Sequence, residues 1–269
     1  MNKFLLAGVG IVAFGITGMA GAADLPQAPI HRAAIEAPYN WIGLYAGING
    51  GAGRSNDNGV SFSPANTDTA IFFPGVVPGN VSGQANGVLA GGQIGYNWQT
   101  RANWIFGVEA DFDWANIKGS GSASTTVAFF DPFTTAAQTK LDSFSSLRAR
   151  AGYAWDRFLV YGTGGAAFGK AELQTSVLDT RDCGPGGVCA ANATSKWLVG
   201  WTIGGGAELG LTSNLSAKVE YLYYDLGSVS HTAVDPRDTP PGVPVFGSSA
   251  NYRGSVVRVG LNYKLGALQ

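Results

Sequence analysis

Three acidic residues at alternate positions are the first candidates for chemistry in this chain. Glu109, Asp111 and Asp113 lie two residues apart, and side chains at that spacing share one face of a β-strand. Neighbouring carboxylates could act as a general acid and a general base. The alternative is that they form salt bridges with Arg148 and Arg150 across the next hairpin. We favour the salt bridges, so the sequence predicts a structural role for these acids.

A glycine-rich stretch offers a second candidate. Residues 162–167 fit the Gly-x-Gly-x-x-Ala form of a dinucleotide-binding loop, and Asp182 follows at about the distance expected of a ribose contact. A cysteine-bearing loop follows this stretch, where a dinucleotide fold would place an amphipathic crossover helix. We therefore interpret the glycines as room for close packing.

His231 and its neighbours are the third candidate. With Ser228, Ser230 and Asp235 it could form a hydrolase or acyltransferase group on a loop. Serine and aspartate are common in loops, however, and this spacing matches no known motif. We therefore predict that the protein is not an enzyme and has no catalytic residues or cofactor.

The elements that position these residues alternate between apolar and polar side chains. Residues 88–98 and 104–114 both alternate with period two, which predicts strands with one apolar and one polar face. Aromatic residues stand at the ends of these strands, as they do at the interfaces of membrane-spanning hairpins. A soluble β-sandwich would alternate too, so the hairpin alone leaves both folds open.

The rest of the chain repeats this pattern. Eight candidate strands are at or above the roughly 9 to 11 residues that a tilted strand needs to cross a bilayer. They span 41–53, 87–99, 104–118, 140–155, 158–172, 196–209, 215–225 and 252–265. The connections alternate between short turns and long loops, as in outer-membrane barrels. The predicted fold is an all-β, up-and-down antiparallel transmembrane barrel of eight strands, with short periplasmic turns and long extracellular loops.

The N-terminus predicts export. A positive start, an apolar stretch and the small residues 20–22 match a secretory signal peptide. We expect a signal peptide at 1–22, a proline-containing periplasmic segment at 23–38 and the barrel at 39–269. The predicted location is the outer membrane of a Gram-negative bacterium.

Composition excludes several other classes of protein. Charged residues make up 13 % of the chain and the net charge is −1, which argues against a nucleic-acid partner. The cysteines Cys183 and Cys189 are close in sequence, and an oxidising compartment favours a disulfide between them over free thiols. His31 and His231 lie far from the cysteines and from each other, whereas structural zinc needs four ligands. We therefore predict no metal site.

Strand parity predicts which side chains face the lipid and which face the lumen. The aromatic residues expected at the lipid interfaces are Trp41, Trp98, Trp104, Trp114, Trp155, Trp197, Trp201 and Tyr263. The opposite parity collects five acids and five bases: Glu109, Asp111, Asp113, Arg148, Arg150, Glu208, Lys218, Glu220, Arg258 and Lys264. An eight-stranded barrel is only wide enough for its side chains. We predict a salt-bridged plug, with an ion-selective constriction as the alternative.

Several motifs resemble one known family. They are Ala-Asp-Leu-Pro at 23–26, Tyr-Asn-Trp-Ile-Gly-Leu-Tyr-Ala-Gly at 39–47, Tyr-Gly-Thr-Gly-Gly at 161–165, Glu-Tyr-Leu-Tyr-Tyr-Asp at 220–225 and Val-Arg-Val-Gly-Leu-Asn-Tyr-Lys-Leu at 257–265. Together they resemble the alphaproteobacterial outer-membrane immunogenic proteins, which are porin-like, OmpA-type eight-stranded barrels. The resemblance implies a surface antigen with a role in envelope integrity. Such barrels usually end on an aromatic residue, where this chain has Leu265.

The expected partners follow from the predicted location. They are outer-membrane lipid and lipopolysaccharide, the β-barrel assembly machinery, and host or envelope molecules at the extracellular loops. Apolar clusters at 71–74, 127–132 and 243–246 could form a contact surface, or could extend the strands and pack together. The alternative functions are a narrow porin for small solutes and a haem-binding uptake protein, for which His231 on an exposed loop is the only candidate ligand.

Overall fold

Ten antiparallel strands make up the regular structure of the part of the chain that the structure describes. The computed structural model describes residues 39–57, 59–65, 75, 77–126, 132–179, 187–234 and 244–265. Within these ranges no helix is long and apolar enough to cross a membrane. The predicted signal peptide and periplasmic segment, 1–22 and 23–38, lie outside the described residues. The strands are β1 (Gly43–Ser55), β2 (Val60–Pro64), β3 (Asn80–Val81), β4 (Asn86–Gln99), β5 (Trp104–Thr125), β6 (Phe133–Trp155), β7 (Phe158–Leu178), β8 (Val188–Gly210), β9 (Leu215–Val234) and β10 (Pro244–Lys264).

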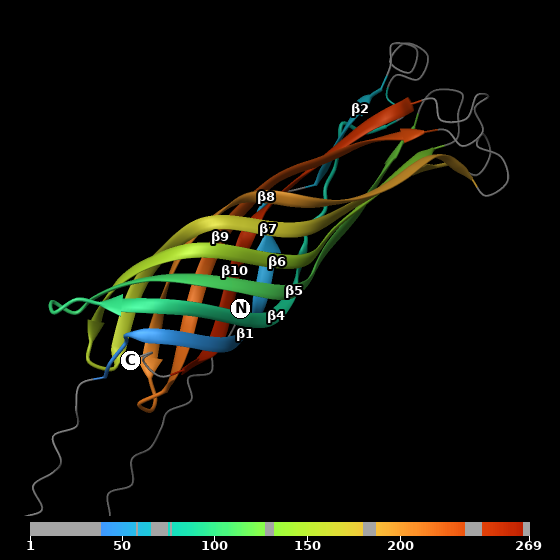
Figure 1. Cartoon of the computed structure of the whole chain (residues 1–269). Helices are drawn as coiled ribbons and strands as arrows, with labels where there is room; N and C mark the ends of the chain where they lie inside the picture. The colour runs from blue at the N-terminus through green and yellow to red at the C-terminus, as the bar shows by residue number, and fades with distance from the viewer. Residues whose placement is uncertain are drawn as a thin grey trace, which may run out of the picture. The chain divides into compact units, whose positions relative to one another are not determined.

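Eight of these strands close into a ring. Each pairs with the next in the order β1, β4, β5, β6, β7, β8, β9, β10, and β10 pairs back with β1. Tyr45 lies opposite Lys264 at the start of this closing ladder, and Ser55 lies opposite Gly254 at its end. The predicted eight-stranded antiparallel barrel is confirmed. Figure 1 shows the strands running obliquely around it.

The two ends of the barrel differ, as predicted. Short turns at 100–103, 156–157 and 211–214 join neighbouring strands at one end. At the other end β5 to β10 extend much further, toward the upper right of Figure 1. Asn103 and Asp156 adopt positive φ angles of 62° and 52° in two of the short turns, a conformation that Asn and Asp tolerate better than most residues.

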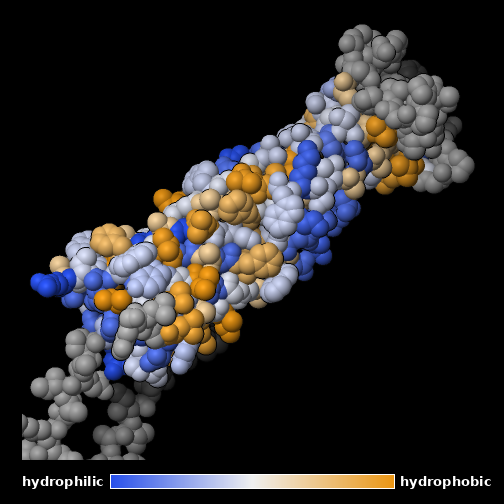
Figure 2. Space-filling model, in the orientation of Figure 1, coloured by the Kyte–Doolittle hydropathy of each residue, from blue (hydrophilic) through white to orange (hydrophobic). Residues whose placement is uncertain are grey.

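The outer wall carries the apolar face of each strand. On β4 and β5, Val88, Ile94, Phe106, Val108 and Phe112 are all more than two-fifths exposed. Figure 2 shows many orange, hydrophobic side chains on the part of the barrel nearer the short turns. An exposed surface of this kind suits lipid better than water. The polar face of the same strands points inward.

The strands continue well beyond the predicted membrane segments. β6 begins at Phe133, where the sequence predicted 140, and β9 ends at Val234, where it predicted 225. The additional residues bury an apolar cluster of Phe133, Val177, Ala190, Ala233 and Phe246. The apolar cluster at 243–246 was expected either to form a contact surface or to extend a strand and pack. Phe246 does the second, since it lies on β10 and is buried in this cluster. Residues 71–74, 127–131 and 243 lie outside the described residues.

Beyond the membrane segments the barrel becomes two facing sheets. β1 ends at Ser55, and β2 takes its place beside β10, with Val60 opposite Ala250. All ten strands follow one another in a single hydrogen-bonded order, and the interrupted ladder between β8 and β9 divides this part of it into two groups, which we call its sheets: β5 to β8, and β9, β10, β2 and β3. The Tyr252 hydroxyl donates a hydrogen bond to the carbonyl oxygen of Glu172 from one sheet to the other. We call this part of the molecule the outer sandwich.

Gly227 marks the point where β9 enters the outer sandwich. Its φ is +82°, and a Cβ atom built on it would meet nothing within 4 Å. The backbone conformation alone therefore calls for glycine here. The Asp225 side chain accepts a hydrogen bond from the Gly227 N–H at 2.9 Å, and the pairing of β9 with β10 shifts between Asn251 and Arg253.

We predict that Gly227→Ala lowers the free energy of unfolding by about 1 to 2 kcal/mol, because an L-residue is strained in the left-handed region. Gly79→Ala is the matched control, since a Cβ at Gly79 also meets nothing within 4 Å and its φ is not positive. Urea unfolding in detergent micelles, followed by tryptophan fluorescence, measures both variants. If the two variants had equal urea midpoints, an alanine at position 227 would not be strained by the left-handed backbone there.

Candidate functional site: a buried charge network

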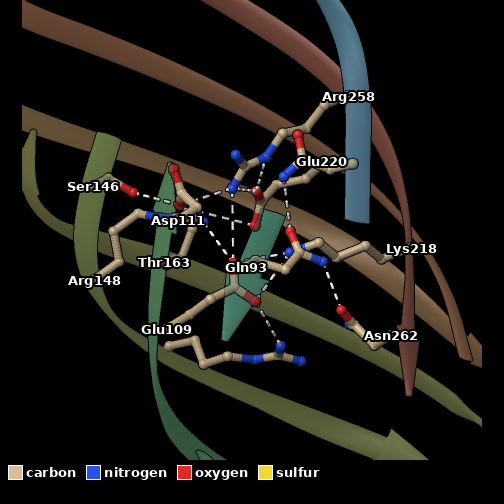
Figure 3. Close-up of polar contacts among 12 residues, drawn as sticks. Gln93, Glu109, Asp111, Ser146, Arg148, Thr163, Lys218, Glu220, Arg258 and Asn262 are labelled. Atoms are coloured by element: carbon tan, nitrogen blue, oxygen red, sulfur yellow. Dashed lines mark hydrogen bonds and ion pairs between the residues drawn. The ribbon is translucent and has the colours of Figure 1, made fainter. Parts of the chain in front are cut away.

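Nine charged side chains meet inside the barrel. They come from five strands, and each has at most 6 % of its surface exposed: Glu109, Asp111, Asp113, Arg148, Arg150, Glu208, Lys218, Glu220 and Arg258. Their positions follow from strand alternation combined with register. Glu109 lies opposite Arg148 on the β5–β6 ladder, and Glu220 lies opposite Arg258 on the β9–β10 ladder. Opposite charges thus meet as cross-strand neighbours, as shown in Figure 3.

Arg148 connects three strands. Its Nη2 atom lies 2.6 Å from Glu109 Oε1 and 2.9 Å from Asp111 Oδ2. Its Nη1 atom lies 3.0 Å from Glu220 Oε1, on β9 across the lumen. The side chain of Arg148 is completely buried. One guanidinium therefore links β6 to carboxylates on β5 and on the far wall.

Arg258 makes a similar set of contacts from β10. Its Nε donates to Glu220 Oε2 at 2.7 Å, and its Nη1 donates to Asp113 Oδ2 at 3.0 Å. Its Nη2 donates to Asp111 Oδ2 at 3.1 Å. Asp111 therefore lies between two guanidinium groups, and it also accepts a hydrogen bond from the Ser146 hydroxyl at 2.6 Å.

Glu109 and Glu208 extend the network toward the short turns. Lys218 Nζ donates to both oxygens of Glu109, at 2.8 and 2.9 Å. Arg150 Nη2 donates to Glu208 Oε2 at 2.8 Å, and its guanidinium lies 4.1 Å from the centre of the Tyr161 ring. Each of the two acids is thus bound to a basic side chain on another strand.

The predicted tenth member of the network, Lys264, does not belong to it. Its Nζ donates to the carbonyl oxygen of Asn40 at 2.7 Å and lies 5.3 Å from the centre of the Tyr39 ring. Lys264 has the correct parity, but it stands at the end of β10, at the mouth of the barrel. The network therefore contains five acids and four bases, and the predicted balance of five against five is wrong.

Trp41 is also misplaced by the sequence prediction. It is only 4 % exposed, its ring packs edge-on against Tyr39, and its Nε1 donates to the carbonyl oxygen of Asp156 at 2.9 Å. It shares the inward parity of Tyr45, which explains why it faces the lumen. The other predicted interface aromatics lie on the exposed outer wall: Trp98, Trp104, Trp114, Trp155, Trp197, Trp201 and Tyr263.

Neutral polar side chains complete the network, and the sequence prediction did not include them. Gln93 Nε2 donates to Asn262 Oδ1 at 2.6 Å, and Asn262 Nδ2 donates to Glu208 Oε1 at 2.8 Å. The Tyr45 hydroxyl donates to Glu109 Oε2 at 2.8 Å. The inward parity of these residues is the signal that could have identified them.

Apolar layers lie on both sides of the network. Toward the short turns, Trp41, Ile105, Leu159 and Tyr161 belong to one buried cluster. Toward the outer sandwich a larger cluster begins, with side chains that are at most 3 % exposed: Leu89, Ile117, Leu141, Phe144, Leu222 and Val256. The charges therefore occupy a middle layer of the barrel interior.

The candidate catalytic groups are not assembled. Ser228 and Ser230 are exposed on the outer face of β9, whereas His231 is half-buried on the inner face. The expectation of an exposed His231 is wrong, because the glycine bulge at Gly227 changes the parity of β9. Residues 162–167 form part of β7, which is a strand and not a loop before a helix. Asp182 and Asp235 lie outside the described residues.

Of the two cysteines, the structure describes Cys189. Cys189 on β8 is disulfide-bonded, but Cys183 lies outside the described residues, and their pairing stays a prediction. Among the residues that the structure describes, no group of three or more His, Cys, Asp or Glu side chains could hold a metal ion.

A second, smaller polar group lies in the outer sandwich. Nε2 of His231 on β9 lies 2.7 Å from the Thr175 hydroxyl on β7, and Ser248 on β10 lies 3.5 Å from the same hydroxyl. Burial lowers the pKa of His231 below its usual value, and the nearby Lys196 lowers that pKa further. The neutral imidazole is therefore the form that suits the folded sandwich.

Comparison with known proteins agrees with this geometry. A family model described as "Outer membrane protein beta-barrel domain" matches residues 17–264. The 31 kDa outer-membrane immunogenic protein of Brucella melitensis is 33 % identical over 271 residues, which cover 98 % of this chain and all of that protein. The 22 kDa outer membrane protein of Rhizobium leguminosarum is 33 % identical over 140 residues, 51 % of this chain and 53 % of that protein.

A solved structure shows a related fold. The outer membrane protein OprG of Pseudomonas aeruginosa superposes with a TM-score of 0.52 at 12 % sequence identity. The match covers 86 % of this chain and all of that chain. At this level of identity the likeness concerns the fold alone.

We predict that Arg258→Ala destabilises the barrel by roughly 3 to 5 kcal/mol, because it leaves buried carboxylates without their cation. Arg253→Ala is the matched control on the same strand, since the Arg253 side chain is 42 % exposed in its ion pair with Asp57. The control should have little effect, as exposed ion pairs contribute little. Urea titration in micelles measures both variants, and equal losses would contradict a special role for the buried network.

The lowered pKa of His231 predicts a loss of stability in mild acid. A histidine whose folded-state pKa lies below its unfolded value of about 6.5 takes up its proton more readily when unfolded. Stability should therefore fall as the pH drops through and below that value. His231→Gln, which keeps a polar side chain but does not titrate there, should show a flatter profile between about pH 7.5 and 5. Parallel profiles would refute this role of His231.

Proposed function

Because this chain belongs to the family of outer membrane proteins with a β-barrel domain, we propose that it is a surface protein that stabilises the envelope and presents its outer sandwich to partners. In this proposal the lumen is closed by its own side chains and passes no solutes. The observation that carries it is the pair of arginines, Arg148 and Arg258, which reach carboxylates on other strands across the lumen.

The energetics of the network support a closed lumen. A solute passing this level would have to separate Arg148 from Glu220, or Arg258 from Asp113, whose charged atoms lie 3.0 Å apart in both pairs. Breaking a buried ion pair is strongly unfavourable, on the order of 3 to 5 kcal/mol, since it leaves uncompensated charge. The apolar layers on either side add a second obstacle, because a hydrated ion gains nothing from contact with them.

The outer wall supports a role in the envelope lipid. Trp104 and Trp155 lie near the short turns, and Trp114 and Trp197 lie toward the outer sandwich, all four with exposed side chains. Such aromatic residues favour the two membrane interfaces. In the proposal the lipid band lies between these two levels.

Lysines just beyond this band support lipopolysaccharide as a partner. Lys118 and Lys140 lie directly opposite each other on β5 and β6, where like charges repel, and the ion pair of Lys140 with Asp142 offsets only part of this charge. Lys170 is close by on β7, opposite Ser143. Phosphate groups of the outer leaflet would offset this repulsion. The β-barrel assembly machinery, and host or envelope molecules at the extracellular loops, complete the proposed set of partners.

A catalytic role receives no support from the network. Glu109, Asp111 and Glu220 each contact at least two cations within 4.0 Å. A carboxylate held in this way is a poor general base, because its charged form is already stabilised. The proposal therefore assigns these acids a structural role, with no enzymatic activity and no resident cofactor.

Planar-bilayer recordings test the closed lumen. We expect the purified protein to show no stable conductance steps at either polarity, because ions would have to disrupt the charge network and two apolar layers. A wide channel-forming porin in the same membrane serves as the positive control. Reproducible openings of the purified protein would contradict the proposal and favour the narrow-porin alternative.

Labelling of introduced cysteines is a second test of the closed lumen. Ser146→Cys places a thiol inside the network, where the native side chain is 3 % exposed. Ser228→Cys places one on the exposed face of β9. A charged, membrane-impermeant thiol reagent should label the second variant and leave the first unlabelled, whereas labelling of both would indicate a water-filled lumen.

A further inference from the structure

The barrel wall is interrupted between β8 and β9. These strands pair from Trp201 opposite Asp225 down to the short turn, and again at Ala191 opposite Val234. Between these points the two strands do not pair: residues 192–200 of β8 and 226–233 of β9, all within the described part of the chain, form no ladder with one another. The other ladders of the ring show at most isolated register shifts. We call the interrupted stretch the β8–β9 seam.

The bulge at Gly227 explains the seam. Below it the inward side chains of β9 are even-numbered, as for Leu222 and Tyr224, and above it they are odd-numbered, as for Val229 and Ala233. From this point β9 remains paired with β10, with Ser230 opposite Ser249. β9 thus joins the second sheet of the outer sandwich and leaves the edge of β8 behind.

The edge of β8 is accessible at the seam. None of the residues 192–200 is buried, although β8 stays paired with β7 along this stretch, with Lys196 opposite Ala171 and Thr194 opposite Leu173. Ala171 and Leu173 are completely buried. Only the side of β8 that faces the seam lacks a ladder. An unpaired strand edge of this kind presents backbone donors and acceptors to any extended chain.

Both ends of the seam are closed. At the upper end Asn192 Nδ2 donates to the carbonyl oxygen of Thr232 at 2.6 Å. At the lower end Gly200 packs closely on the backbone of Asp225, so that a Cβ atom there would lie 1.9 Å from its carbonyl oxygen. The unpaired stretch of β8, which we call the slot, is therefore of limited length. It lies at and beyond the outer membrane interface that Trp197 and Trp201 mark.

Beside the slot two lysines stand against one glutamate, Glu172, which lies opposite Ser195, so the local charge is net positive. Lys196 is exposed on β8, and no ion pair joins it to another residue in the described ranges. Lys170 lies opposite Trp197 on the neighbouring strand. Lys196 is also close enough to His231 to lower the pKa of that imidazole. An incoming segment with acidic side chains would match this charge.

We propose that the β8–β9 seam is a strand-addition site for an extended, acidic polypeptide segment of a partner protein at the cell surface. Backbone hydrogen bonds to the edge of β8 would supply affinity, and Lys196 would select acidic side chains. The proposal rests on the interaction role proposed above and names its partner chemistry. It can fail while the lumen stays closed, because the conductance measurement does not involve the seam.

Defined peptides test the backbone part of the proposal. The probe is a fluorescent peptide of alternating valine and glutamate, as long as the slot, titrated against the full-length protein in detergent and followed by anisotropy. A matched peptide with alternate backbone nitrogens methylated should bind at least about tenfold more weakly, since several hydrogen bonds are lost. Equal affinity for both peptides, or no binding of either, would overturn the proposal.

The charge part has its own matched variants. Lys196→Glu should weaken binding of the acidic peptide by about two- to fivefold, the scale of an exposed ion pair. Arg54→Glu, an exposed charge reversal on β1 away from the seam, should leave binding unchanged. A peptide with lysine in place of glutamate should show the opposite response to Lys196→Glu. Identical effects of the two variants would overturn the assignment of Lys196.

Disulfide trapping locates the bound peptide. A peptide carrying one cysteine should form a mixed disulfide with Ser195→Cys at the seam and not with Ser122→Cys, which is exposed on β5. Equal trapping at both positions would exclude the seam as the site. Dimers of the Ser195→Cys variant that form without peptide would assign the edge of β8 to a second copy of the chain and overturn the partner proposed here.

Discussion

Closure of the wall by backbone hydrogen bonds is the constraint on which the rest of this structure depends. In lipid no water is available to satisfy an exposed N–H or C=O group, so the ladder between β1 and β10 must complete the ring. Eight strands enclose a lumen with room only for side chains. Any charge that strand alternation points inward must therefore find an opposite charge there. The contacts of Arg148 and Arg258 with acids on facing strands are a direct consequence of that narrow ring.

Alternation within the lipid band made most of the ring predictable. The aromatic and aliphatic residues of 104–114 face outward at every second position, and this signal sets both the strand and its inner face. Beyond the band the outer face no longer has to be apolar, and the same strands read as loops. The inward side chains Phe133 and Val177 are still apolar, but the outward side chains are no longer apolar, so the alternation that identifies a membrane strand is lost. His231 was expected to be exposed because the sequence predicts a loop there, whereas β9 continues to Val234 and the bulge at Gly227 turns His231 inward.

The sequence predicts which side of each strand carries the site, but not how far along the barrel each side chain lies. Parity placed the nine buried charges correctly because each lies on the inner side of a regular strand, as Glu109 and Glu220 do. Parity could not show that Lys264 lies at the mouth of the barrel, nor that Trp41 closes the same end from inside. The neutral partners Gln93 and Asn262 were missed because amide side chains are unremarkable in a sequence. Their importance appears only when register brings them within 2.6 Å of each other.

The position of the seam follows from the same constraint that closes the ring. Below Trp201 the pairing of β8 with β9 is continuous, because an unpaired backbone group facing lipid would be costly. Above it water and lipid headgroups can satisfy these groups, so the cost of leaving an edge unpaired falls sharply. A glycine bulge at Gly227 can therefore separate the strands there without opening the membrane segment. The chain thus keeps a buried, paired charge network within the bilayer and an unpaired strand edge outside it, and the two can change independently.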